Sequence, residues 1–263
     1  MSVATVVMRN ITCHQTTESG HDEVYYLPPS VVRRTTHGVT SDPTLPAGPT
    51  ASQGANAGGP DGRIAAWDCN DSGYLSNQEP QAELFSVSVG AGEHVVVTLT
   101  LMESDGTNYA DMELTAAKAG AAALAAVTTA FPPSAVVTAP LALALTAGTA
   151  VMQALKGLFS NDDDTLGAMT FVLEGAADGV RLVQQGAVSG TVIHAAANGS
   201  PAAFTARLGG AGANYEFTLG IDGAVMAAPV PNGAPADPGP VVKLPRRPTK
   251  PGGWLPRTGA SRF

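Results

Sequence analysis

The feature that most restricts the fold of this sequence is a long stretch without charge, enclosed by two segments that read as β-strands. No Asp, Glu, Lys or Arg lies between Lys118 and Lys156. A β-branched, apolar strand precedes this stretch at 95–102, and another follows it at 168–173. We therefore predict that a segment of about 108–160 is inserted between these two strands.

The inserted segment reads as two helices. It is rich in alanine, the residue with the highest helix propensity, over 116–130 and again over 141–159. Pro132 and Pro133 interrupt the helical pattern, and Pro140 suits the first turn of a second helix. Two apolar helices joined by a proline-containing turn form a helical hairpin.

The rest of the first 228 residues has the pattern of an all-β domain. Short segments of alternating or β-branched residues are separated by Gly, Asn and Pro turns. The expected strands cover 3–12, 85–89, 180–183, 190–195, 203–208 and 215–221. Because only 5% of the residues are aromatic, the core must be built mainly from Ala, Val and Leu. We predict a mainly β protein, an antiparallel β-sandwich over 1–228 with the helical hairpin inserted.

The C-terminal segment, 229–263, has a different composition. It is rich in proline and glycine and has no apolar period, which is typical of an extended arm and not of a domain. Basic and apolar residues alternate with its prolines, and we predict that they bind a partner. These residues are Arg246, Arg247, Trp254, Leu255 and Phe263. The alternative is a flexible linker whose aromatic residues have no role.

Acidic turns follow or precede three of the expected strands. Asp22 and Glu23 enter an aromatic strand, Glu103 and Asp105 leave the strand at 95–102, and Asp164 comes just before Leu166-Gly167. Calcium takes six to eight oxygen ligands, and clustered carboxylates at one end of a sheet supply them. These five carboxylates are therefore the candidate cation ligands of the sequence. The alternative is that these acidic turns are only solvated edges of the sheet and bind no ion.

This pattern resembles the C2 family of calcium-binding β-sandwiches over 1–106 and 161–222. The resemblance is carried by Asp22-Glu23, by the strand that ends in Glu103-Ser104-Asp105, and by Asp164-Thr165-Leu166-Gly167. It differs from the family pattern by a Glu in place of the first Asp and by the inserted hairpin. The resemblance implies a C2-like sandwich that binds calcium through Asp22, Glu23, Glu103, Asp105 and Asp164 and docks on a membrane or another surface.

The sequence gives little support to several classes of function. The net charge of −8 argues against a nucleic-acid partner, because phosphate binding needs a basic surface. The sequence has no HExxH or GxSxG motif, so we expect neither an enzyme nor a catalytic residue. Cys13 and Cys69 read as two buried thiols or as one disulfide, and both readings stay open. The segment 136–155 only just reaches the length of a membrane-spanning helix, so a membrane partner is the lesser expectation.

Two functions follow from these patterns. The first is a non-enzymatic structural protein that assembles with copies of itself or with other subunits into a particle, shell or filament, using the arm for subunit contacts. The second is a calcium-dependent module that binds a membrane or surface. The first ten residues lack the basic and apolar regions of a secretory signal, which favours synthesis in the cytoplasm or a place in a particle.

Overall fold

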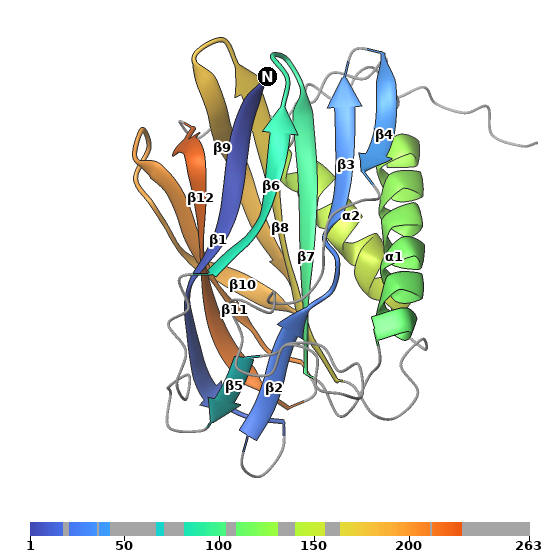
Figure 1. Ribbon diagram of the computed structural model, residues 1–263, viewed down its shortest axis with the longest axis vertical. Coiled ribbons are helices and arrows are strands. Elements are labelled where there is room, and N and C mark those ends of the chain that lie inside the picture. Colours follow the sequence, from blue (N-terminus) through green and yellow to red (C-terminus); the bar gives the residue numbers. More distant parts are fainter. Residues whose placement is uncertain are drawn as a thin grey trace, which may run out of the picture. The chain divides into compact units, whose positions relative to one another are not determined.

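A computed structural model of the chain describes residues 1–17, 21–35, 37–42, 67–70, 82–103, 109–130, 140–155, 164–210 and 212–227. Within these residues the protein is mainly β, with twelve strands in one sheet and two helices (Figure 1). The strands before the helices are β1 (Ser2–Gln15), β2 (His21–Tyr26), β3 (Ser30–Thr35), β4 (Gly38–Asp42), β5 (Trp67–Asn70), β6 (Ala82–Val89) and β7 (His94–Glu103). The strands after them are β8 (Asp164–Ala176), β9 (Gly179–Val188), β10 (Gly190–Ala195), β11 (Pro201–Leu208) and β12 (Asn214–Met226).

The sheet curls around one core because β12 connects two runs of strands. Most of β12 lies between β1 and β11, with Met8 and Phe204 both opposite Leu219. Its last residues, Ala224–Met226, lie beyond the pairing with β1 and pair with β9, which begins the run β9-β8-β7. Gly223 lies between the two parts of β12. Its φ is +83°, a backbone conformation that residues with a side chain rarely adopt.

The prediction of a purely antiparallel sheet is wrong at this connection. The pairing of β12 with β9 is parallel, from Ala224 opposite Val180 to Met226 opposite Leu182. The other described pairings are antiparallel, so the sheet is mixed. A curled sheet brings distant strand ends side by side, and this contact has no signal in the local alternation of residues.

The interior of the curl is filled by alternate residues of the facing strands. On β7 these are Val95, Val97, Leu99 and Leu101, all buried. Across the core, the ring of Phe171 on β8 meets that of Phe204 on β11 edge to face, with centroids 5.9 Å apart. The expected dominance of small aliphatic residues holds, although the largest buried side chains also include tyrosines and phenylalanines.

Helices α1 (Tyr109–Ala130) and α2 (Pro140–Leu155) confirm the predicted insertion between β7 and β8. They cover one face of the sheet, α1 over β3 and β4 and α2 over β7, β8 and β9 (Figure 1). Their buried residues recur at helical spacing, as Ala119, Ala123 and Val127 do on α1. The buried residues of α2 are Ala144, Ala147, Val151 and Leu155. Small side chains let both helices approach the sheet closely, and the Thr170 hydroxyl donates a hydrogen bond of 3.0 Å to the Ala144 carbonyl.

The first helix begins about two turns before its predicted start. α1 begins at Tyr109 and not near 116, because 109–115 also contains good helix formers such as Ala110, Met112 and Leu114. The described part of α2 ends at Leu155, and the rest of the predicted second helix, 156–159, lies outside the described residues. The predicted arm over 229–263 lies outside the described residues.

Candidate functional site

The strand ends that flank the helical insertion meet at one end of the sheet. Glu103, the last residue of β7, is opposite Asp164, the first residue of β8. On its other side Glu103 is opposite Val24 of β2. The sequence motifs on either side of the hairpin are therefore neighbours in space, near the lower ends of β2 and β7 in Figure 1.

The five residues predicted to bind calcium are only partly described. Asp22 and Glu103 are fully buried, and Asp164 is partly exposed. Glu23 pairs with Asp68 of β5 through its backbone, but its side chain is not among those described. Asp105 lies outside the described residues. The structure thus brings the strand positions of four predicted residues, Asp22, Glu23, Glu103 and Asp164, to the same end of the sheet.

Asp22 is the centre of a buried hydrogen-bond cluster. The Tyr215 hydroxyl donates to Asp22 Oδ2 over 2.6 Å. The backbone N–H of Thr17 donates to the same oxygen over 2.8 Å, and the Thr17 hydroxyl donates to Oδ1 over 3.0 Å. Three donors therefore satisfy a carboxylate that would otherwise be costly to bury.

Tyr215 is the second member of this cluster. It is fully buried on β12, 193 residues from Asp22 in the sequence. Burial raises the pKa of its hydroxyl far above the ordinary value, and the hydrogen bond to Asp22 raises the pKa further. The hydroxyl therefore stays protonated and serves as a donor over the whole physiological pH range.

Both cysteines border the same cluster. Cys13 of β1 is opposite Tyr215, and Cys69 of β5 is opposite Asp22. Both are buried and reduced, and both interact electrostatically with the Tyr215 hydroxyl. We name Cys13, Thr17, Asp22, Cys69 and Tyr215 the Asp22 cluster.

The geometry of the Asp22 cluster suits a structural role. Hydrogen bonds occupy both oxygens of Asp22, so a cation would have to replace these donors. Within the described part of the chain, no three His, Cys, Asp or Glu side chains are arranged to hold a metal ion. The calcium site stays a prediction, because the side chains of Glu23 and Asp105 are outside the description.

Sequence reasoning placed Asp22 in a calcium loop, whereas it lies inside β2. A signal for this was present, because Asp22 has the same strand phase as the buried Val24 and Tyr26. Tyr215 and Thr17 were missed. Tyr215 is in phase with Phe217 and Leu219, but nothing local to Tyr215 indicates its partner.

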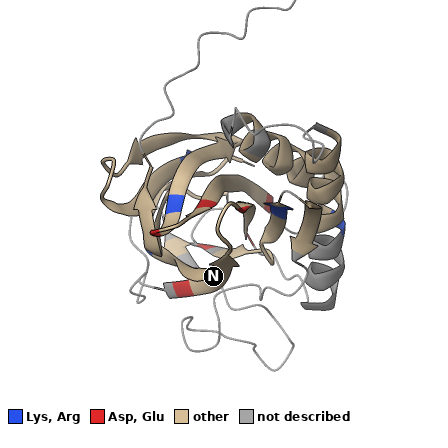
Figure 2. Cartoon of the chain, turned by 90° about the horizontal axis from the view of Figure 1, so that it is seen from above, with Lys and Arg blue, Asp and Glu red and all other residues tan. Residues whose placement is uncertain are grey.

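A second candidate site is the outer surface of the helical hairpin. Its described residues after Lys118 carry no charge, and several are exposed. The exposed ones are Ala121, Ala125, Thr128, Thr129, Ala142, Thr149 and Gln153. Figure 2 shows the described parts of both helices as mostly tan, with acidic and basic residues on the strands.

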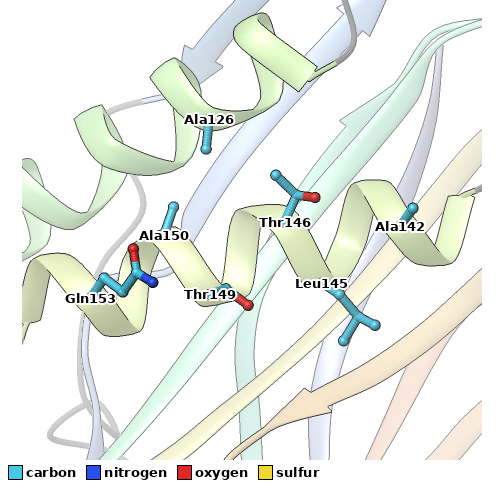
Figure 3. A pocket seen from close by; sticks show the side chains of 7 residues that line it. All are labelled: Ala126, Ala142, Leu145, Thr146, Thr149, Ala150 and Gln153. Carbon is cyan, nitrogen blue, oxygen red and sulfur yellow. The ribbon is translucent and has the colours of Figure 1, made fainter. Parts of the chain in front are cut away.

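The two helices enclose a shallow depression of about 450 Å³. Figure 3 shows Ala126 of α1 pointing toward α2 across it. The residues that line it are Ala126, Ala142, Leu145, Thr146, Thr149, Ala150 and Gln153. We name the exposed residues and this lining together the hairpin face.

The five residues predicted to bind a partner, from Arg246 to Phe263, lie outside the described residues. Neither α1 nor α2 is long and apolar enough to cross a bilayer over the residues described. Comparisons with protein-family models, with curated proteins and with solved structures found no match.

Proposed function

We propose that this chain is a non-enzymatic structural protein that associates with copies of itself through the hairpin face. The observation that carries the proposal is the absence of charge on that face among the described residues. An ordinary soluble surface is charged at about a quarter or more of its residues. Depletion of charge is the mark of the central part of a protein interface.

The shape of the hairpin face also favours a partner. Its exposed side chains are almost all Ala and Thr, which are short and lose little rotamer entropy when a contact forms. Helices with small outer side chains pack closely against another helix or a flat surface. The depression between α1 and α2 would receive a larger side chain of the neighbouring copy.

The charge distribution along the sequence gives the arm a role in the same assembly. Residues 229–263 contain six Lys and Arg and one Asp, which gives a formal charge of +5. The remaining 228 residues contain eight Lys and Arg and 21 Asp and Glu, which gives −13, and the two parts add to the net charge of −8. We propose that the arm binds the acidic domain of another copy, with Arg246 and Arg247 as ion-pairing residues.

Introducing charge on the hairpin face is expected to disrupt association. We expect Ala125→Glu combined with Thr149→Glu to weaken self-association at least about tenfold, because two desolvated like charges would face each other across the contact. Both positions are exposed, so the melting temperature should stay within about 2 °C of the wild type. Sedimentation velocity over a concentration series measures the association.

The matched control places a charge on another exposed position. This control variant is Val3→Glu. Val3 lies on β1, which is not one of the strands beneath the helices, and it is 55% exposed. We expect its association to equal that of the wild type. Equal weakening by the hairpin and β1 variants would show that net charge, and not the hairpin face, governs association.

A second candidate function is a C2-like, calcium-dependent module that docks on a membrane or surface. The observation that favours it is the pairing of Glu103 with Asp164 at the end of the sheet where the hairpin is inserted. Titration calorimetry is expected to give a calcium-dependent heat for the wild type and a lower affinity for Asp164→Ala. A wild-type chain that gives no heat with calcium would end this candidate.

A further inference from the structure

The Asp22 cluster brings the two cysteines of the chain to the same buried hydroxyl. Both cysteines contribute to the raised pKa of the Tyr215 hydroxyl, Cys13 through a hydrogen bond and Cys69 through its charge. The backbone agrees with this arrangement, since Cys13 is opposite Tyr215 and Cys69 is opposite Asp22. Side chains directly opposite in antiparallel strands have Cβ atoms about 4.5–5.5 Å apart.

The hydrogen bond from Tyr215 to Asp22, 2.6 Å long, closes this arrangement. This hydrogen bond connects β12, which pairs with the strand of Cys13, to β2, which pairs with the strand of Cys69. The strands that carry the cysteines also approach each other directly, with Cα atoms of β1 and β5 within 8 Å. A disulfide requires Cα atoms about 4.4–6.8 Å apart, so the proposal includes a movement of one strand toward the other.

β5 is the strand able to make that shift. It has four residues and lies at one end of the strand order, with β2 as its neighbour among the described strands. We propose that Cys13 and Cys69 are a disulfide-forming pair, and that oxidation links β5 covalently to β1. This inference does not depend on self-association.

The reaction needs an oxidant, and a small disulfide such as oxidised glutathione supplies it. One cysteine thiolate attacks a glutathione sulfur, which gives a mixed disulfide and releases one glutathione. The second cysteine thiolate then attacks the protein sulfur of that mixed disulfide and releases the second glutathione. Each cysteine has lost one proton, and the two electrons reside in the two glutathione thiols.

Burial determines when the reaction happens. Cys13 is 3% exposed and Cys69 is 1% exposed, so a reagent in water reaches them only while the chain is open. We therefore expect slow oxidation of the native protein and rapid oxidation during refolding. Once formed, the bond closes a loop from 13 to 69 and restricts the unfolded chain, which raises stability.

The test compares two treatments of the full chain with oxidised glutathione, one of the native protein and one during refolding from denaturant. Each sample is then denatured, alkylated and analysed by mass spectrometry without reductant. After refolding we expect no alkylated cysteine, a mass lower by two hydrogens, and a peptide that links Cys13 to Cys69. The melting temperature of this product should exceed that of the reduced protein by roughly 5–15 °C.

Cys13→Ser and Cys69→Ser are the matched controls. Each should end with one glutathione attached and with no rise in melting temperature. Three results would each overturn the proposal. They are two alkylatable cysteines after refolding, glutathione on both cysteines of the wild type, and disulfide-linked dimers. Oxidation in the refolding sample but not in the native sample supports the proposal and measures how well the fold protects the pair.

Discussion

Gly175→Ala is expected to lower the free energy of unfolding by about 3 kcal/mol, one of the largest effects available at a single position. A Cβ atom at 175 would lie 1.8 Å from the carbonyl oxygen of Gly90 and 2.6 Å from its carbonyl carbon. Both are backbone atoms, so no side-chain rotation relieves the overlap. The strand β8 or the turn between β6 and β7 has to move.

That turn cannot move without loss of other bonds. The N–H of Gly92 donates to the Gly175 carbonyl over 2.8 Å, and the N–H of Gly175 donates to the Glu93 carbonyl over 2.9 Å. Glu93 in turn accepts from the N–H of Gly90. Displacement of the turn therefore breaks the contact between the β6–β7 connection and β8.

Urea unfolding followed by circular dichroism measures this effect, with Gly120→Ala as the matched control. Gly120 is within α1, where a Cβ atom meets only Ser30 Oγ at 3.9 Å. Because alanine favours a helix by up to about 1 kcal/mol over glycine, this variant should be slightly more stable than the wild type. Two variants of equal stability would contradict the close contact at Gly175.

Asp22→Ala is expected to lower the free energy of unfolding by about 3–5 kcal/mol. It removes the acceptor of three hydrogen bonds in a region from which water is excluded. The Tyr215 hydroxyl and the Thr17 N–H would lose that acceptor. Tyr215→Phe removes only one of the three bonds, so we expect a smaller loss of about 1–3 kcal/mol.

Chemical denaturation of both variants, beside the double variant, tests the cluster. We expect the double variant to lose less than the sum of the two single losses, because Asp22 and Tyr215 share one hydrogen bond. Asp178→Ala is the control, since the Asp178 side chain is exposed and pairs with Arg181 at the surface. Additive losses at Asp22 and Tyr215 would show that their hydrogen bond contributes nothing to stability.

Local composition was enough to predict the helical hairpin and its place between β7 and β8. Alanine content and the missing charges indicate helices, and prolines separate them. The direct pairing of β7 with β8, which places Glu103 opposite Asp164, is a finding of the structure. The sequence predicted only that these two residues lie at one end of the sandwich.

The curl of the sheet and the Asp22 cluster could not be predicted in this way. The parallel contact of β12 with β9 depends on a bend at Gly223, and glycines are frequent throughout this sequence. The bond between Asp22 and Tyr215 joins residues 193 positions apart, and no alternation pattern identifies such a partner. An acidic residue just before an aromatic strand suggests a metal ligand in a loop, although the alternation of the strand predicts that its side chain is buried.

Sedimentation velocity of the full chain beside a chain that ends at Ala228 tests the proposed assembly most directly. Each copy has a mass of 26.5 kDa. We predict that the full chain sediments as a species of several copies and that the shortened chain, still folded by circular dichroism, sediments as a smaller one. A full chain that stays at the mass of one copy at every concentration would contradict the account.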